Sequence, residues 1–254
     1  MTGSGNNTYL LASAGAALLV DAGVGHPQHL ADLDRALTEQ HASLQTVLVT
    51  HGHTDHASGA PVIAAAHRTA AFAKHPWPDL DARYGITWQP IGEGDEVAAG
   101  TERLVVLHTP GHSPDHLAFW HEPTATLFTG DLVLLGGSVM IHWSRGGKLA
   151  EYLSSLERLL ALEPRLILPA HGARVENPRA LLVSYLDHRR ERERQVIAAL
   201  GAGRATVQAI AESLYDGLAP ALMPAARENV RAHLEKLKEE GVAVDEDGRW
   251  TRRG

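Results

Sequence analysis

His51-Gly52-His53-Thr54-Asp55-His56 is the stretch of sequence that decides the fold. It comes directly after Thr46-Val47-Leu48-Val49-Thr50, a β-branched run typical of a buried strand. The ends of strands are where α/β sheets place their binding sites. Burying an aspartate and several imidazoles without partners is costly, so we expect these side chains to face a ligand rather than a core. The alternative is a solvated polar loop.

Three later segments repeat the pattern of a strand end followed by a metal-ligand residue, and they weigh against a solvated loop. They are Thr109-Pro110-Gly111-His112, Thr129-Gly130-Asp131 and Pro169-Ala170-His171-Gly172. Glycine beside each ligand lets the backbone approach an ion closely. The combined set contains histidine and aspartate but no cysteine, because the chain has none. Such a set suits two divalent ions, zinc foremost with iron or manganese as alternatives, and Asp131 is the natural candidate to bridge them.

The four segments resemble, residue by residue, the motifs of the metallo-β-lactamase superfamily, and the resemblance extends from Asn7 to His171. It implies an α/β fold, a four-layer αββα sandwich that holds two metal ions. Asp55 would bind the second ion and, secondarily, accept a proton or orient the nucleophile, so Asp55 and Asp131 are the expected catalytic residues. By this resemblance the first ion is held by His51, His53 and His112, the second by Asp55, His56 and His171, and Asp131 lies between them.

The chain changes character after Pro178. Several helical patterns are followed by a short terminal hairpin, an order typical of a winged-helix-like module. The helices are expected at residues 181–200, 206–215 and 224–240, and the hairpin at residues 242–251.

The expected domains are residues 1–177, a hydrolase domain of the metallo-β-lactamase fold, and residues 178–254, a small winged-helix-like domain. The Thr8-Tyr9 start, the segment Tyr185–Arg192 and this tail together resemble the lactamase-β-2-like branch of the superfamily, whose members carry such a module. A tail with balanced charge is more often a packing or dimerisation element than a DNA reader, so a homodimer is an expected assembly.

The chemistry follows from the metal pair. A water that bridges two divalent ions loses a proton near neutral pH, while one ion polarises a carbonyl or phosphoryl oxygen. The sequence therefore predicts a dinuclear metal-dependent hydrolase that uses a metal-bridging hydroxide on a thioester, lactone or related ester or amide. The alternative is a metal-dependent endoribonuclease of the same branch. A binding module with a structural metal is disfavoured, since structural zinc sites are normally four-coordinate and closed.

Composition narrows the partners and the compartment. The 254 residues are 44% hydrophobic and 21% charged, as in an ordinary globular protein. The net charge of the chain is −7, with −8 before Pro178 and +1 from it onward, which favours a small-molecule or acyl-carrier substrate over RNA. No run approaches the about 20 apolar residues of a membrane-spanning helix, so no membrane partner is expected. The lack of cysteine and of a signal-peptide-like start favours the cytoplasm.

Further polar residues near these motifs have two interpretations each. His116 is a candidate to orient a ligand, against an ordinary histidine at a strand edge. His142 and Trp143 follow Asp131 and are candidates for substrate contacts, against simple packing of their loop. Asp21 ends a strand and is expected to be a turn residue or an acceptor behind a ligand. The run from Arg189 to Arg194 alternates in charge and is expected to be a solvated helix face or an interface.

Overall fold

The computed structural model describes residues 5–253. The chain forms two compact units. The first contains the chain up to Thr109, Asp115–Gly137 and Leu162–Arg179, and the second contains Pro110–Pro114, Ser138–Ala161 and the chain from Ala180. The predicted domain boundary after residue 177 stays a prediction. Among the described residues, no helix is both long and apolar enough to cross a membrane.

The first unit contains two five-stranded sheets. The first sheet has the order β1-β2-β3-β4-β5 and begins with a hairpin, whose turn residues Ala14 (φ 48°) and Gly15 (φ 80°) adopt left-handed conformations. The strands after this hairpin pair in parallel, because helices connect them. The bounds are β1 Tyr9–Ser13, β2 Ala16–Val20, β3 Ser43–Leu48, β4 Ala71–Lys74 and β5 Gln89–Pro90.

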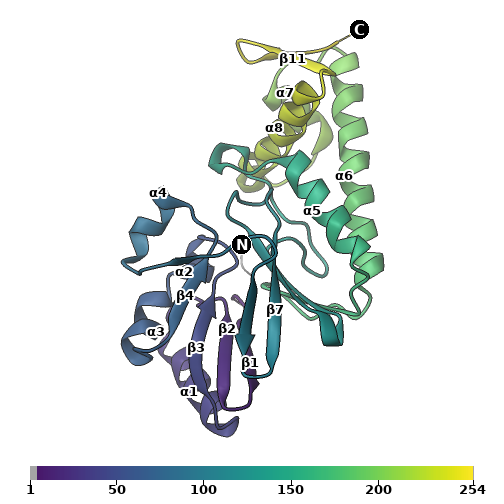
Figure 1. Cartoon of the computed structure of the whole chain (residues 1–254). Coiled ribbons are helices and arrows are strands. Elements are labelled where there is room, and N and C mark those ends of the chain that lie inside the picture. The colour runs from purple at the N-terminus through teal and green to yellow at the C-terminus, as the bar shows by residue number, and fades with distance from the viewer. Residues whose placement is uncertain (1–4, 254) are drawn as a thin grey trace. The chain divides into compact units, whose positions relative to one another are not determined.

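Helices cover the outer face of the first sheet (Figure 1). The main one, α1 (Pro27–Glu39), begins with proline, and the side chain of His26 accepts from the Gln28 N–H at its start. Its Leu33 and Leu37 are buried against the sheet, as the spacing of the leucines predicts. The other elements are α2 Thr54–Ala57, α3 Ala60–Ala66, α4 Pro78–Asp81 and the 3₁₀ turn η1 Ala82–Tyr84.

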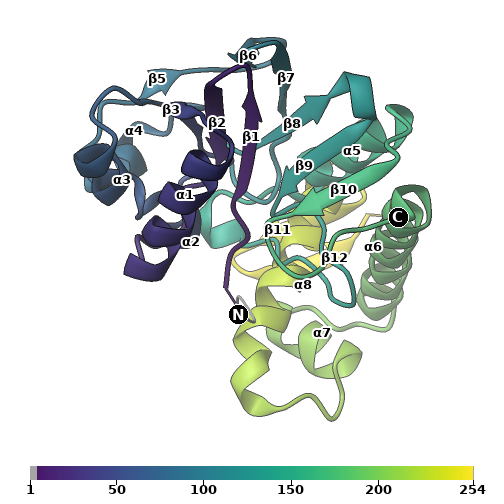
Figure 2. The same ribbon diagram turned by 90° about the horizontal axis from the view of Figure 1, so that it is seen from below.

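The second sheet has the order β10-β9-β8-β7-β6 (Figure 2). Its last pair, β9 and β10, is parallel, and the other neighbours are antiparallel. Apolar side chains from both sheets, such as Leu18, Leu48 and Phe119, form one buried cluster between them. The bounds are β6 Glu96–Ala99, β7 Glu102–His108, β8 Leu117–His121, the 3₁₀ turn η2 Glu122–Thr124, β9 Thr126–Gly130 and β10 Leu166–Pro169.

Backbone hydrogen bonds join the loops at one end of the two sheets. The Leu117 N–H donates to the Thr50 carbonyl over 2.7 Å, which ties the second sheet to the loop after β3. The Ala170 N–H donates to the Gly130 carbonyl over 3.1 Å, and the Asn7 N–H to the Ala170 carbonyl over 2.7 Å. These bonds hold the ends of strands from both sheets together, which is where the predicted ligands lie.

The second unit contains the predicted winged-helix-like module, with three helices and a terminal hairpin. Val196, Ile210, Val230 and Trp250 form its buried core. Its elements are η3 Trp143–Arg145, α5 Leu149–Ala161, α6 Pro178–Gly201 (which begins in the first unit), α7 Val207–Leu214, η4 Pro220–Leu222, α8 Met223–Glu239, β11 Ala243–Glu246 and β12 Arg249–Arg252.

The charged run on α6 differs from its expectation most at Arg189. Arg190 and Arg194 are exposed, as predicted for a solvated face, but Arg189 is only 2% exposed. Its guanidinium donates to the Val139 carbonyl and lies 5.4 Å from the ring centre of Tyr152. Alternating charge along the sequence gave no sign of these partners, because they come from distant segments.

The loop after β2 approaches α3 so closely that only glycine fits at residue 59. A Cβ atom there would lie 2.1 Å from the Ala22 carbonyl oxygen, which belongs to the backbone and cannot rotate away. We expect Gly59→Ala to lower the free energy of unfolding by about 3 kcal/mol, measured by urea titration. Gly201→Ala is the matched control, since nothing lies within 4 Å of its Cβ position. Equal stability of the two variants would contradict this packing.

Candidate metal centre

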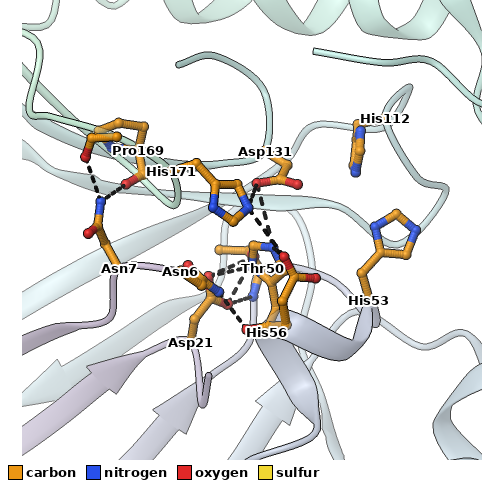
Figure 3. A network of polar contacts seen from close by, with 12 residues as sticks. Asn6, Asn7, Asp21, Thr50, His53, His56, His112, Asp131, Pro169 and His171 are labelled. Carbon is orange, nitrogen blue, oxygen red and sulfur yellow. Dashed lines mark hydrogen bonds and ion pairs between the residues drawn. The ribbon is translucent and has the colours of Figure 1, made fainter. Parts of the chain in front are cut away.

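The loops at the strand ends bring metal-ligand side chains into two groups. Asp55, His56 and His171 form one group, whose ligand atoms lie within 4.8 Å of one another. His51, His53 and Asp131 belong to the other group, whose ligand atoms also lie within 4.8 Å of one another. His112 would complete this second group, but it lies on Pro110–Pro114 in the second unit, so its participation stays a prediction. Figure 3 shows His171 and Asp131 facing one another across the centre.

The most complete geometry surrounds His56. Its Nε2 atom lies 3.7 Å from Asp55 Oδ2 and 3.5 Å from Asp131 Oδ1. His171 Nε2 lies 3.3 Å from the same Asp55 oxygen and 3.2 Å from the same Asp131 oxygen. Donor atoms bound at about 2.1 Å to one tetrahedral ion lie about 3.4 Å apart. The four atoms therefore have the mutual spacing of ligands around a single ion.

The donor set also fits a metal by its unsatisfied atoms. His56 is fully buried, and within the described residues its Nε2 atom makes no hydrogen bond. A buried polar atom without a hydrogen bond is costly unless another group satisfies it. An ion between His56, His171 and the two carboxylates would do so. Two nitrogen and two oxygen donors, with no sulfur, suit zinc and its borderline neighbours.

Asp21 orients His56 from behind. Asp21 Oδ2 lies 2.8 Å from His56 Nδ1, and Asp21 Oδ1 accepts from the backbone N–H and the hydroxyl of Thr50, over 2.8 and 2.9 Å. Asp21 is buried and adopts φ 64°, a left-handed conformation that turns its side chain into the site. A carboxylate on Nδ1 leaves Nε2 as the ligand atom. Of the two interpretations of Asp21, the structure supports the acceptor behind a ligand.

Charge in this centre is tightly coupled. Burial alone lowers the pKa of His56, but the carboxylates of Asp21 and Asp131 raise it well above its usual value. Burial raises the pKa of Asp131, whereas His56 and His171 hold it well below its usual value. Hydrogen bonds to Asp131 and Asp55 raise the pKa of His171 to about 10. The Asp131 carboxylate is therefore ionised at neutral pH, as metal binding requires.

We expect Asp21→Asn to weaken the binding of the ion held by His56 by about 10- to 100-fold, as loss of an outer partner typically does. The amide keeps the size of the side chain but cannot accept from both Thr50 and His56. Zinc titration against a competing chelator measures the change. Asp34→Asn, on a side chain that is 61% exposed, is the control. Unchanged affinity in the folded Asp21 variant would contradict the orienting role.

Residues just before β1, together with its first residue, hold the loop that carries His171 by hydrogen bonds. The Asn7 side chain donates to the Pro169 carbonyl over 3.0 Å (Figure 3) and to the Gly172 carbonyl over 2.8 Å. The Tyr9 hydroxyl donates to the Pro169 carbonyl over 2.7 Å. His171 Nδ1 donates to the Gly5 carbonyl over 2.9 Å. This bond leaves Nε2 of His171 facing the carboxylates. Asparagine at this place in the sequence carried no recognised signal of such a clamp.

His116 lies behind Asp131 rather than at the surface. It is fully buried, its Nδ1 atom is 2.9 Å from the Thr109 hydroxyl, and its Nε2 atom accepts from the Asp131 N–H over 3.1 Å. A Cβ at Gly130 (φ 48°) would come 2.7 Å from this Nε2 atom, so glycine permits the close approach. This geometry favours the orienting interpretation of His116 over that of an ordinary histidine at a strand edge.

His112, His142 and Trp143 belong to the second unit. His112 Nδ1 lies 3.1 Å from the Met140 carbonyl. The ring of Trp143 is 41% exposed, and the Arg231 guanidinium lies 4.6 Å from its centre. Burial lowers the pKa of His142. The proposed substrate contacts of His142 and Trp143 stay predictions.

Two sheets packed face to face, with histidine and aspartate groups at their strand ends, define a metal-dependent hydrolase of the α/β class. The model of the metallo-β-lactamase superfamily matches residues 1–171, and that of the β-lactamase-associated winged helix domain matches residues 206–250. The chain belongs to the metallo-β-lactamase superfamily. Both parts of the predicted family resemblance are thereby confirmed.

Known proteins resemble the chain over most of its length. The beta-lactamase-like protein 2 homolog of Drosophila melanogaster is 34% identical, over 95% of this chain and 85% of that protein. The atrochrysone carboxyl ACP thioesterase of Aspergillus fumigatus is 32% identical, over 77% of this chain and 60% of that protein. A metallo-β-lactamase family protein from Thermus thermophilus shares the fold, with a TM-score of 0.79 at 24% identity, over 98% of this chain and 94% of its own.

Proposed function

We propose that this chain is a dinuclear metal-dependent hydrolase acting on a thioester, lactone or related ester. The observation that carries the proposal is the position of Asp131. Its Oδ1 atom lies within 3.5 Å of His56 and 3.2 Å of His171, and the same residue belongs to the group of His51 and His53. One carboxylate shared by two donor groups suits a pair of ions held side by side.

In this proposal His51, His53 and His112 hold one ion, Asp55, His56 and His171 hold the other, and Asp131 serves both. Divalent ions at such a site supply Lewis acidity, which lowers the pKa of coordinated water and polarises a substrate oxygen. Zinc is proposed, with iron or manganese as alternatives. A relative of known structure, 29% identical with a TM-score of 0.58, over 71% of this chain and 93% of its own, is described in a di-iron-bound form.

The residues of the centre fix charge and protons around the reacting group. Burial raises the pKa of Asp55, but His171 and His56 lower it below its usual value, so its carboxylate is ionised and suited to binding metal. Asp55 and Asp131 thus act as negatively charged metal ligands and proton acceptors rather than as acids. Asp21 and the Gly5 carbonyl hold the imidazoles of His56 and His171 in orientation.

The substrate class rests on charge and on relatives. The negative charge of the body favours a small-molecule or acyl-carrier substrate, and the fungal relative is named an ACP thioesterase. The chain spans 60% of that relative's length, so the relative's activity is assigned to this chain only as a proposal. The cytoplasmic location, a homodimer and the domain boundary after residue 177 are likewise proposed from the sequence.

A panel of substrates tests the proposal. We expect purified chain loaded with zinc to hydrolyse an acyl thioester or a lactone with a higher kcat/KM than a β-lactam, and to leave single-stranded RNA intact. The same panel with Asp131→Asn gives the background rate. Cleavage of RNA in preference to the esters would overturn the ester assignment in favour of the endoribonuclease. Zinc bound without any hydrolysis would favour a structural metal instead.

A further inference from the structure

A buried charged cluster, which the site described above does not use, lies behind the loop that joins His51 to His53. Lys74, at the end of β4, is fully buried. Its Nζ atom lies 2.6 Å from Asp81 Oδ1 and 3.1 Å from Asp115 Oδ2, and the side chains of Lys74 and Asp115 are both 0% exposed. A buried ammonium between two carboxylates is costly to assemble, so its place in the fold needs a reason.

The cluster ends on the peptide groups on either side of Gly52. Asp115 Oδ2 accepts from the Gly52 N–H over 2.8 Å, and the Tyr84 hydroxyl donates to the Gly52 carbonyl over 2.6 Å. The N–H belongs to the peptide that joins His51 to Gly52, and the carbonyl to the peptide that joins Gly52 to His53. Each link between the two histidines is therefore held by one side chain.

Packing removes the remaining freedom of this loop. A Cβ at Gly52 would lie 2.6 Å from Leu80 Cδ2 and 3.2 Å from Asp115 Oδ2, so the backbone touches its neighbours directly. His51 Nε2 and His53 Nδ1 lie only 2.8 Å apart, so a small shift of either ring changes their separation markedly. Functional side chains must be held within about 0.5 Å of their working geometry.

We infer that Lys74, Asp115 and Tyr84 form a positioning unit for the ion held by His51 and His53. The inference rests on the proposed function, in which these histidines bind metal. Asp115 fixes the Gly52 N–H, and the Lys74 ammonium, 3.1 Å from Asp115 Oδ2, holds the Asp115 side chain in place. The other ion is positioned separately, because Asp21 orients His56 and the Gly5 carbonyl orients His171. Each ion is therefore positioned mainly by its own set of side chains, and Thr50, which contacts Asp21, also lies 3.1 Å from His51 Nδ1.

Zinc titration of the full chain against a competing chelator tests this inference. We expect Asp115→Asn and Lys74→Met each to lower the affinity for one of the two zinc ions by about 10- to 100-fold. The affinity for the other zinc ion should stay within about threefold of the wild-type value. Tyr84→Phe, which removes a single hydroxyl, should act in the same direction with a smaller effect. Combining Asp115→Asn with Asp21→Asn should weaken both ions, each by its own factor, because independent effects add.

Lys236→Met is the matched control. Lys236 is 11% exposed and lies 2.8 Å from Glu193 in the second unit, so its loss also removes a largely buried charge. We expect it to lower the melting temperature while both zinc affinities stay unchanged. Lys74→Arg keeps the positive charge, so we expect it to restore the zinc affinity that Lys74→Met weakens. Loss of the fold would not explain such a recovery.

The outcomes separate the inference from the proposed function. If the wild-type chain binds fewer than two zinc ions, the dinuclear proposal fails. If it binds two, and folded Asp115→Asn and Tyr84→Phe bind both with unchanged affinity, only the positioning role is overturned. Equal weakening of both ions in these variants also overturns it. Should Lys74→Met fail to fold, Asp115→Asn and Tyr84→Phe decide the question.

Discussion

Replacing Asp131 with asparagine is expected to lower kcat/KM by at least about 1000-fold, which corresponds to about 4 kcal/mol of lost transition-state stabilisation. The carboxylate lies within 3.5 Å of His56 and 3.2 Å of His171 and also belongs to the group of His51 and His53. The amide has nearly the same size but lacks the negative charge. Both donor groups would lose their shared ligand at once, so we expect the metal content to fall as well.

Steady-state kinetics with a thioester and elemental analysis of the same sample measure these effects. Circular dichroism checks that the fold is retained. We expect the variant to fold, because Asp131 lies outside the buried clusters of the two sheets. Asp34→Asn, at an exposed carboxylate on α1, should leave both activity and metal content unchanged. An Asp131→Asn variant with wild-type turnover would remove this residue from the mechanism.

Stripping the metal with a chelator is expected to abolish hydrolysis and to lower the melting temperature by roughly 10 °C. An ion present at about 1000 times its dissociation constant stabilises the fold by about 4 kcal/mol. In a chain of about 150 to 250 residues each kcal/mol shifts the melting temperature by about 2 to 4 °C. The sheets should stay folded, because their apolar cores do not depend on the ligand loops.

Thermal melts followed by circular dichroism, before and after chelation, measure the shift. Adding back zinc should restore both the melting temperature and the activity, and comparison with iron and manganese identifies the metal that supports turnover. Buffer exchange without chelator is the control for handling. Full activity in chain that elemental analysis finds free of metal would contradict a metal-dependent reaction.

The sequence offered a definite candidate ligand set because those residues lie in short segments with fixed spacing. Asp55 and His56 are neighbours, and the structure brings His171 and Asp131 to within 3.7 Å of them from the ends of β10 and β9. Strand ends that meet at one edge of a sheet made this gathering predictable.

The supports of the site could not be predicted in the same way. Lys74 and Asp115 are far apart in sequence, and neither stands in a motif that indicates their contact. Asp21 had two interpretations, because only the tertiary fold turns its side chain toward His56. Arg189 was expected on a solvated helix face or at an interface, yet it is buried and donates to the Val139 carbonyl in a distant loop. Local pattern identifies residue types suited to a metal, whereas their orientation depends on long-range packing.

Short elements were also beyond the sequence pattern. The two-residue strand β5 and the four-residue strand β6 contain too few positions to show alternation. The helical turn α2 begins at Thr54, inside the ligand motif, where polar residues mask any helical period. These elements nevertheless shape the site, since α2 carries both Asp55 and His56.

Metal content measured together with thioester hydrolysis on one sample tests the central claim most directly. Chain stripped of metal is titrated with zinc, and bound zinc and kcat/KM are determined at each step. We predict about two zinc ions per chain at saturation, as the paired donor groups require, with activity that rises as the second ion binds. Saturation at one ion or none, or hydrolysis that does not follow zinc content, would contradict the dinuclear hydrolase.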